Sequence, residues 1–424
     1  MRAFDELSEI LEENELGETF CILPWLQIGV QPTGILRPCP WTIDYPRDAA
    51  GSCFYASQHS LEDYKKSDSI SALKQRMLKG EKSQICERCY EYEGTGSPSK
   101  RIHETLNFKH LINKEFLADE NSHKILELRL GNRCNIGCVT CSPGSSSFLG
   151  NEFSKQESKN QSDYHRDFQK SFLHSQKIKS QWFTDKNFWE QVEEILPNIK
   201  TIYLAGGEPT MIPEVWNFLD EMVGKGKTQS INIELSTNMT LLGRKHLEIL
   251  KNFKSVRFFV SFDGIGDTIE YIRYPTRWKI VEKNFKNLLQ FNEPSFEVII
   301  TPTVSIFTLW HLDDLYQWAF DVQKDFEKKI RISCNTVLRD PDYQCIENLP
   351  NELKLTAWDQ IERIKNKYPE EIGTHSLSKV QKYLKEREGN VDLFVEGQKH
   401  VENFDKIRKK NWQNIVPIYR KYWT

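Results

Sequence analysis

The chain has 424 residues, of which 38% are hydrophobic and 28% are charged. At roughly 150 residues per domain, this length predicts two or three domains, or one large α/β barrel with an appendage. The formal net charge of −3 argues against non-specific nucleic-acid binding. No apolar run is long enough to span a bilayer. We therefore expect neither a nucleic-acid partner nor a membrane partner.

The first segment, MRAFDELSEILEENELGE, predicts a short amphipathic helix with Phe4, Leu7, Ile10 and Leu11 on one face. It is acidic and lacks the basic start and apolar centre of a signal peptide. We therefore expect a cytoplasmic protein, in which the ten cysteines stay reduced. Reduced cysteines serve as metal ligands, as nucleophiles or as buried core residues.

Eight of the ten cysteines lie before residue 142. Cys21 and Cys39 stand in a C-x12-G-x4-C pattern, and Cys86 and Cys89 form a C-x2-C pair. Four thiolates from two such pieces satisfy a closed site for either an iron–sulfur cluster or zinc. Cys53 is a fifth cysteine in this region, and it is either a spare thiol or an alternative ligand.

Alternation of strands and helices begins at residue 125. The helices include 213–223 and 244–253, and the six predicted strands are 125–130, 199–206, 231–237, 255–262, 296–304 and 329–335. This order predicts a parallel βα array, either an open barrel or a doubly wound sheet. The polar residues 150–182 are interpreted as an insertion.

Residues 346–424 are rich in Lys and Glu with apolar residues at helical spacing, and they predict a helical region packed on the outside of the barrel. The predicted domains are residues 1–120, which hold the cysteine-rich region, residues 121–345, which hold the barrel, and the helical residues 346–424. We expect Cys334 to be a core residue and Cys345 not to be a ligand.

A second cysteine pattern follows the first strand of the array. Residues 131–147 read GNRCNIGCVTCSPGSSS, with Cys134, Cys138 and Cys141 spaced C-x3-C-x2-C. In parallel βα proteins, ligands bind at the carboxyl ends of the strands. Three thiolates can hold a [4Fe–4S] cube and leave one iron open to another ligand. A zinc site would need a fourth ligand, and none lies within residues 125–150.

The spacing and its position resemble the radical S-adenosylmethionine (SAM) superfamily. The resemblance implies a partial (β/α)6 TIM-like barrel in which Cys134, Cys138 and Cys141 hold a [4Fe–4S] cluster whose open iron binds SAM. It also implies reductive cleavage of SAM to a 5′-deoxyadenosyl radical, which abstracts hydrogen from a substrate. The one departure is Thr140, because many members carry an aromatic residue just before the third cysteine.

Later stretches resemble the SAM-binding motifs of this superfamily. LAGGEPTM (204–211) is similar to its GGEP motif, LSTNM (235–239) to its Ser/Thr-x-Asn position, and FVSFDG (259–264) with a following Arg to its S-x-D-G…R stretch. For Asn238 a helix cap, and for the arginine a surface position, remain the alternatives. The residues implied to contact SAM are Gly206, Gly207, Glu208, Ser236, Asn238, Ser261 and Arg273. The stretch TPTVSIFTLW (301–310) resembles the region that lines the adenine, so Val304 and Ser305 are further candidates.

The earlier cysteines resemble the auxiliary-cluster motif of twitch and SPASM domains. This resemblance implies a second [4Fe–4S] cluster on Cys21, Cys39, Cys86 and Cys89, with structural zinc as the alternative. The region has enough cysteines for one cluster, which resembles a twitch domain. Such a domain usually follows the barrel, whereas here the cysteines precede it.

The resemblance to twitch and SPASM enzymes implies a function for the whole chain. The leading hypothesis is modification of a peptide or protein residue, with the auxiliary cluster accepting an electron or positioning substrate. An external one-electron reductant of the flavodoxin or ferredoxin type would be the redox partner. The alternatives are a small-molecule dehydrogenase of a sugar alcohol or aminocyclitol, and a non-catalytic iron–sulfur protein. No residue stands out as a general acid or base.

Overall fold

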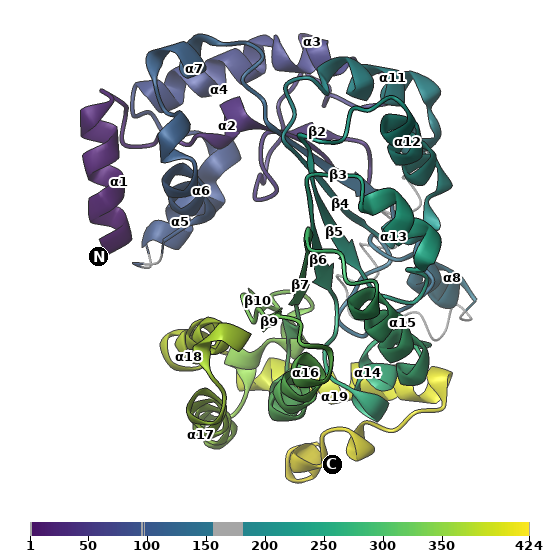
Figure 1. Cartoon of the computed structure of the whole chain (residues 1–424). Coiled ribbons are helices and arrows are strands. Elements are labelled where there is room, and N and C mark those ends of the chain that lie inside the picture. Colours follow the sequence, from purple (N-terminus) through teal and green to yellow (C-terminus); the bar gives the residue numbers. More distant parts are fainter. Residues whose placement is uncertain (1, 95, 97, 156–180, 424) are drawn as a thin grey trace. The chain divides into compact units, whose positions relative to one another are not determined.

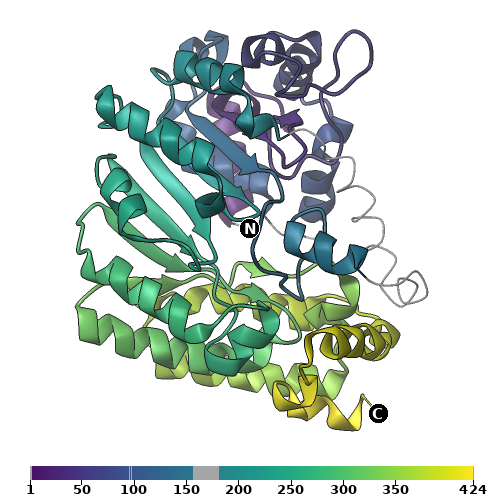
Figure 2. The ribbon, with the colours of Figure 1, turned by 90° about the vertical axis from the view of Figure 1, so that its right-hand side faces the viewer.

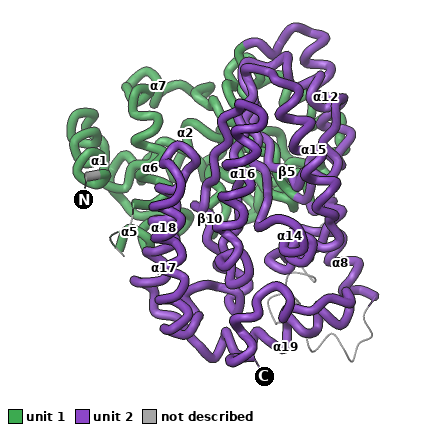
Figure 3. Tube along the Cα trace, turned by 60° about the horizontal axis from the view of Figure 1, so that its bottom comes forward, with its two compact units in different colours: residues 1–131, 178–206, 230–232 green, residues 132–177, 207–229, 233–424 purple. Residues whose placement is uncertain are grey.

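The computed structural model describes residues 2–94, 96, 98–155 and 181–423, and the chain divides into two compact units (Figure 3). Unit 1 comprises residues 1–131, 178–206 and 230–232. Unit 2 comprises residues 132–177, 207–229 and 233–424. Most of the predicted insertion 150–182 lies outside the described residues, although residues 150–154 belong to a helix.

Eight strands form one sheet in the order β2-β1-β3-β4-β5-β6-β7-β9 (Figure 1). β2 pairs antiparallel with β1, whereas the pairs β1–β3, β3–β4, β6–β7 and β7–β9 are parallel. This is a mixed α/β fold with a mostly parallel sheet and a helical C-terminus, and it fits the predicted partial TIM-like barrel. No helix in the described part of the chain is both long and apolar enough to cross a membrane.

Unit 1 contains eight α-helices and four strands among its described residues. They are α1 (Arg2–Glu13), α2 (Leu23–Leu26), β1 (Gln27–Val30), β2 (Leu36–Arg37), α3 (Leu61–Lys65), α4 (Asp68–Leu78), α5 (Glu87–Gly94), α6 (Lys100–Asn107), α7 (Lys114–Ala118), β3 (Ile125–Leu130), α11 (Lys186–Ile195) and β4 (Thr201–Gly206). The predicted N-terminal helix is α1, and its Leu7, Ile10 and Leu11 are buried in a core shared with α2, α4 and α6. β1 was not predicted, because four residues between two cysteines are too short for a clear strand pattern.

Unit 2 contains the remaining described α-helices and strands, and β5 belongs to it except for its first residue. They are α8 (Ser147–Ser154), α12 (Pro213–Gly224), β5 (Asn232–Thr237), α13 (Arg244–Leu250), β6 (Ser255–Val260), α14 (Gly266–Ile272), α15 (Trp278–Gln290), β7 (Phe296–Ile300), β8 (Thr303–Val304), α16 (Leu312–Phe326), β9 (Ile330–Ile332), β10 (Thr336–Val337), α17 (Asn351–Lys367), α18 (Leu377–Glu386) and α19 (Val391–Arg408).

The βα alternation of unit 2 follows from its burial pattern. Along β5 and β6, alternate residues such as Ile233, Leu235, Val256 and Phe258 are fully buried, as expected for strands with a helix layer on one face. Figure 1 shows α12, α13 and α15 along one face of these strands. The strand predicted at 296–304 is interrupted after Ile300, and its last part is β8, which pairs with β10.

Candidate functional site

The loop with Cys134, Cys138 and Cys141 is fixed by the first residues of α8. The Ser147 hydroxyl lies 3.1 Å from the Cys134 amide and 3.2 Å from the Cys134 carbonyl oxygen. The hydroxyl of Ser146, the N-cap residue of α8, donates to the Ile136 carbonyl at 2.7 Å. The predicted cluster loop is therefore held at its backbone, which leaves the sulfur atoms available for a ligand.

Two other parts of unit 2 hold the same loop. The amides of Gly137 and Val139 donate to the carbonyls of Tyr274 (2.6 Å) and Ile272 (2.8 Å), at the end of α14. The side-chain amide of Gln344, which is fully buried, donates to the Val139 carbonyl at 2.8 Å. Gln344 was not predicted as a site residue, because 205 positions separate it from its partner.

The three thiols lie close enough together to influence one another. Burial, followed by the charge of Cys138, raises the pKa of Cys134 to about 12. Burial also raises the pKa of Cys141, and the charges of Cys138 and Cys134 raise it further. Thiols in such a setting stay protonated in the absence of a metal, because only metal binding favours the thiolate strongly enough to release the proton.

Arg273 was predicted to bind the SAM carboxylate, and in the structure it lies beside the cluster loop. Its Nε is 2.8 Å from Oδ2 of Asp263, and its Nη1 donates to Sγ of Cys138 at 3.7 Å. Burial alone would lower the pKa of Arg273, but Asp263 and Cys138 raise it above its ordinary value. Asp263 is fully buried and also accepts a hydrogen bond from the Thr303 amide at 2.7 Å. A permanent positive charge thus stands next to a cysteine thiol.

Glu208 is buried, and its carboxylate is bonded to neighbouring protein groups. Oε1 accepts hydrogen bonds from the Thr210 amide and hydroxyl and from the Thr237 hydroxyl, at 3.2, 2.7 and 2.9 Å. Oε2 accepts one from the Asn238 amide at 2.7 Å. Glu208 therefore joins the segment after β4 to the end of β5.

The two glycines before Glu208 are required by the backbone around them. A Cβ at Gly207 would lie 2.2 Å from the Arg133 carbonyl oxygen, which itself accepts a hydrogen bond from the Glu208 amide. A Cβ at Gly206 would lie 2.6 Å from the Leu130 amide nitrogen, and its φ of +122° also favours glycine. In this structure, close backbone packing by itself accounts for both glycines.

Asn238 connects the end of β5 to the cysteine loop. Its Nδ2 donates to Oδ1 of Asn135 at 3.1 Å, and its Oδ1 accepts from the amide and hydroxyl of Thr240. Asn135 in turn donates to the Thr240 hydroxyl at 2.9 Å. Asn238 is thus part of a turn with Thr240, and it does not cap a helix, because α13 begins at Arg244 with Gly243 as its N-cap. Asn135 and Thr240 were not predicted, although Asn135 lies between two predicted ligands.

The remaining predicted SAM contacts are placed at the carboxyl ends of β5, β6 and β8. Ser236 lies in β5, and Ser261 follows β6, where its amide donates to the Thr237 carbonyl at 3.0 Å. Val304 is fully buried at the end of β8. The Ser305 hydroxyl accepts from the amides of Phe307 and Thr308, so it caps the following turn.

In unit 1, the four predicted auxiliary ligands come together. Cys21, Cys39, Cys86 and Cys89 line one pocket, together with Arg101. Burial raises the pKa of Cys21, and the charges of Cys39, Cys86 and Cys89 raise it further. Burial raises the pKa values of both Cys39 and Cys86 to about 12. These residues belong to segments up to 68 positions apart in the sequence, so folding creates the group.

The walls of this pocket carry positive charge and a hydrogen bond to sulfur. Arg101 is paired with Glu93 at 2.6 Å and also donates to the carbonyls of Glu18 and Phe20. The Trp41 amide donates to Sγ of Cys39 at 3.3 Å. Four cysteines, a cation and an amide donor fit the chemistry of an iron–sulfur cluster. Among the described residues, no three His, Cys, Asp or Glu side chains are arranged to hold a single metal ion.

The other cysteines lie outside both groups. Cys53 does not line the auxiliary pocket, and its backbone forms a bridge to Arg47. Cys334 is fully buried with Sγ 3.8 Å from the Tyr316 hydroxyl, as expected for a core residue. Cys345 is also buried, and its thiol donates to the Pro341 carbonyl at 3.7 Å.

The helical C-terminal region reaches the cysteine loop, which was not predicted. Arg408, at the end of α19, forms a buried ion pair with Glu152 of α8 at 2.7 Å and lies over the rings of Tyr274 and Phe404. Figure 2 shows α8, in blue, beside the yellow α19. Phe404 belongs to an apolar cluster that Cys141 also contacts. The C-terminal region therefore supports the loop.

Comparison with known proteins finds one family model that matches part of the chain. Residues 128–319 match the family model "Radical SAM superfamily". No curated protein matches the chain. Among solved structures, the chain is similar to "Native anSMEcpe with bound AdoMet", with 17% identity over 57% of this chain and 61% of that one, at a TM-score of 0.34.

It is also similar to two structures of SuiB from Streptococcus suis. One is described as bound to S-adenosylmethionine, with 13% identity over 82% of this chain and 71% of that one, at a TM-score of 0.34. The other is described as bound to the precursor peptide SuiA, with 14% identity over 79% and 68%, also at 0.34. The matched residues 128–319 contain the cysteine loop, Glu208, Asn238 and Arg273. Residues 128–319, which are slightly less than half of the chain, are therefore similar to the radical SAM superfamily.

Proposed function

We propose that this enzyme holds one [4Fe–4S] cluster on Cys134, Cys138 and Cys141 and a second on Cys21, Cys39, Cys86 and Cys89, and that it modifies a peptide or protein residue. When bound, the first cluster and SAM together supply a 5′-deoxyadenosyl radical by one-electron reductive cleavage. The observation that carries the proposal is the three-cysteine loop, whose backbone is fixed from several sides while its thiols stay free of covalent partners.

In this proposal the residues around the loop orient the cluster and SAM. Arg273 balances negative charge at Cys138, because its guanidinium stays protonated beside Asp263. Glu208 fixes the backbone after β4 against the end of β5. Oε2 of Glu208, which accepts one hydrogen bond, and the backbone groups of this segment are then available to the amino group of SAM.

The second cluster would accept an electron from an oxidised substrate radical or position the substrate. The pocket lined by four cysteines supports this role, because the Trp41 amide that donates to sulfur favours the reduced form of a cluster. The preference for a peptide substrate follows from the resemblance of the cysteine spacing to twitch and SPASM enzymes. We place the protein in the cytoplasm, with a flavodoxin or ferredoxin type protein as its reductant.

The test compares cysteine variants of the anaerobically reconstituted enzyme. Replacing Cys134, Cys138 and Cys141 with Ala is expected to remove about four irons and to abolish formation of 5′-deoxyadenosine from SAM. Cys53→Ala is the matched control, because Cys53 lies outside both groups, and it should retain the iron content and the SAM cleavage of the wild type. Continued 5′-deoxyadenosine formation by the triple variant would refute the assignment.

A second pair of variants separates the two clusters. Replacing Cys86 and Cys89 with Ala should remove about four irons from the N-terminal site and leave the SAM-dependent spectrum of the other cluster in place. Unchanged iron content, or one zinc ion per chain in the wild type, would contradict an auxiliary iron–sulfur cluster.

A further inference from the structure

One face of the unit 1 sheet carries a row of polar residues that no cluster ligand accounts for. In the register of β2, β1, β3 and β4, Arg37 lies opposite Gly29, Gly29 opposite Glu127, and Glu127 opposite Tyr203. Arg129 is two residues after Glu127 and therefore faces the same side. The opposite face of β3 carries the buried Leu126, Leu128 and Leu130, so the polar row is a distinct feature of this face.

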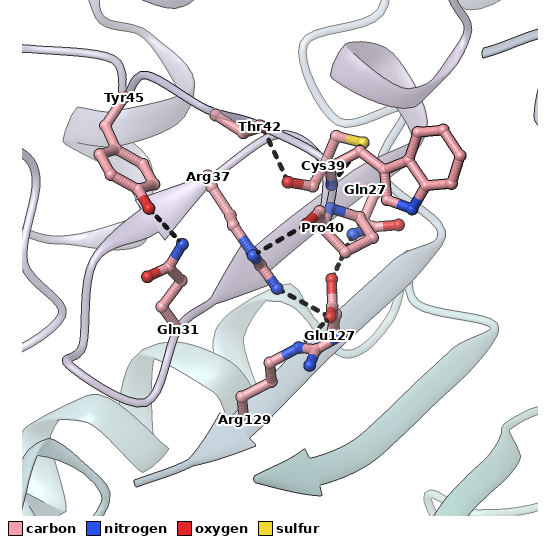
Figure 4. Close-up of polar contacts among 10 residues, drawn as sticks. Gln27, Gln31, Arg37, Cys39, Pro40, Thr42, Tyr45, Glu127 and Arg129 are labelled. Carbon is pink, nitrogen blue, oxygen red and sulfur yellow. Dashed lines mark hydrogen bonds and ion pairs between the residues drawn. The ribbon is translucent and has the colours of Figure 1, made fainter. Parts of the chain in front are cut away.

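Glu127 is the centre of this row. Its Oε1 lies 3.0 Å from Nη2 of Arg37 and 2.7 Å from Nε of Arg129, and its Oε2 accepts from the Gln27 side chain at 2.8 Å (Figure 4). A Cβ at Gly29 would lie 3.2 Å from Cγ of Arg37 and 3.3 Å from Oε2 of Glu127. The glycine therefore leaves the space in which Arg37 crosses β1 to reach Glu127.

Two guanidinium groups share one carboxylate, so the row has an excess of positive charge. Arg37 is buried, and its Nε has no hydrogen-bond partner among the described residues. Both terminal nitrogens of Arg37 have protein partners, because Nη1 donates to the Pro40 carbonyl at 3.3 Å and Nη2 to Glu127. Lys100, whose charge reaches Glu127, is paired with Glu104 at 2.6 Å. The unmatched charge therefore belongs to Arg129.

Arg129 has the geometry to bind a further anion. Within the described residues it is bonded through Nε alone, so its two terminal nitrogens have no protein partner. Its side chain is 38% exposed, whereas that of Glu127 is 4% exposed. The buried Glu127 carboxylate thus fixes the Arg129 guanidinium through Nε. The two terminal nitrogens of Arg129 then form a fork that can bind another group. A guanidinium fork binds a carboxylate through two parallel hydrogen bonds.

We propose that Arg129, held in place by Glu127 and supported by Arg37, is a binding site for a carboxylate group of the substrate. The claim that the carboxylate belongs to a substrate rests on the proposed function, whereas the binding itself does not. A carboxylate matches the site because its two oxygens match the fork and its single charge matches the single excess positive charge.

The test is calorimetric titration of the reconstituted holoenzyme without SAM. The probes are a short alanine peptide with blocked ends and one central aspartate, its asparagine counterpart, a short alanine peptide with a free C-terminal carboxylate, and sodium acetate. We expect a carboxylate probe to bind, and Arg129→Gln to weaken that binding tenfold or more, since a charge-assisted bidentate pair is lost. Arg129→Lys should weaken it less, because it keeps the charge without the fork.

The controls separate a binding role from a structural one. Arg47→Gln, at an exposed arginine of the same unit, should leave binding unchanged. Iron content and Tm show whether each Arg129 variant is folded. If Arg129→Gln does not fold, Arg129→Lys still tests the role of the guanidinium fork. Binding by the aspartate peptide or the free C-terminus assigns the carboxylate to a peptide, and binding by acetate alone assigns it to a small acid.

Two results would overturn the inference. One is that the aspartate and asparagine peptides bind equally while the other carboxylate probes do not bind. The other is that carboxylate binding does not change in Arg129→Gln. SAM cleavage, measured separately, distinguishes this failure from failure of the proposed function. Intact SAM cleavage without carboxylate binding refutes the site alone, and carboxylate binding without SAM cleavage refutes the proposed function alone.

Discussion

At the scale of single residues, Arg273 and Asp263 link the cluster loop to the interior of unit 2. Both side chains are almost completely removed from solvent, and the pair lies against Sγ of Cys138. The resemblance to radical SAM enzymes predicts this arginine as a ligand for SAM, and the structure adds that it is bonded to a carboxylate and a thiol. Its charge therefore acts on the cluster ligand directly.

Replacing Asp263 with Ala should lower the free energy of unfolding by about 3–5 kcal/mol, because the buried Arg273 guanidinium loses its ion-pair partner. The measurement is urea unfolding followed by tryptophan fluorescence. Glu386→Ala, which removes an exposed ion pair with Lys382, should cost less than about 1 kcal/mol. Replacing both partners, as Asp263→Leu with Arg273→Met, should restore part of the loss. Equal effects of the Asp263 and Glu386 variants would contradict the importance of this pair.

At the scale of elements, the sites lie where strands end and the chain turns. The positions of β3, β4, β5 and β6 were predicted from the sequence to within a few residues, because buried strands carry runs of apolar residues. The cysteine loop was also predicted, since its spacing is local. The residues that hold it were not, because Gln344 and Arg408 are distant in sequence and carry no local pattern.

The junction between β4 and the cysteine loop gives a sharp test of backbone packing. Gly207→Ala should displace the loop at Arg133, because the new Cβ would lie 2.2 Å from a carbonyl oxygen. We expect a loss of about 1–3 kcal/mol in the free energy of unfolding, together with weaker iron retention. Gly150→Ala is the matched control, because its Cβ meets nothing within 4 Å in α8, and it should be neutral or stabilising. A Gly207 variant as stable as the control would contradict this account.

The contact between α19 and α8 makes a second prediction at this scale. Arg408→Ala removes the buried ion pair between Arg408 and Glu152, so the loop that precedes α8 should be less well fixed. We expect faster loss of iron to a chelator and a lower Tm than in the wild type. Lys406→Ala, at an exposed position of the same helical turn, should change neither. Identical iron loss in both variants would show that α19 does not support the loop.

At the scale of the whole molecule, each compact unit contains one complete cysteine group. The three-cysteine loop and the residues around it lie in unit 2, and the four-cysteine pocket lies in unit 1. The sequence predicted both groups, because each follows a short spacing rule. It did not predict the polar row around Arg129, since Glu127, Arg37 and Gln27 become neighbours only through strand pairing.

The most direct test of the central claim is the electron paramagnetic resonance spectrum of the anaerobically reconstituted, reduced enzyme, recorded with and without SAM. The account predicts signals from two [4Fe–4S] clusters, of which SAM changes only one, and that one disappears in the Cys134, Cys138 and Cys141 triple variant. Spectra that SAM leaves unchanged in the wild type would contradict the claim that these three cysteines hold a SAM-binding cluster.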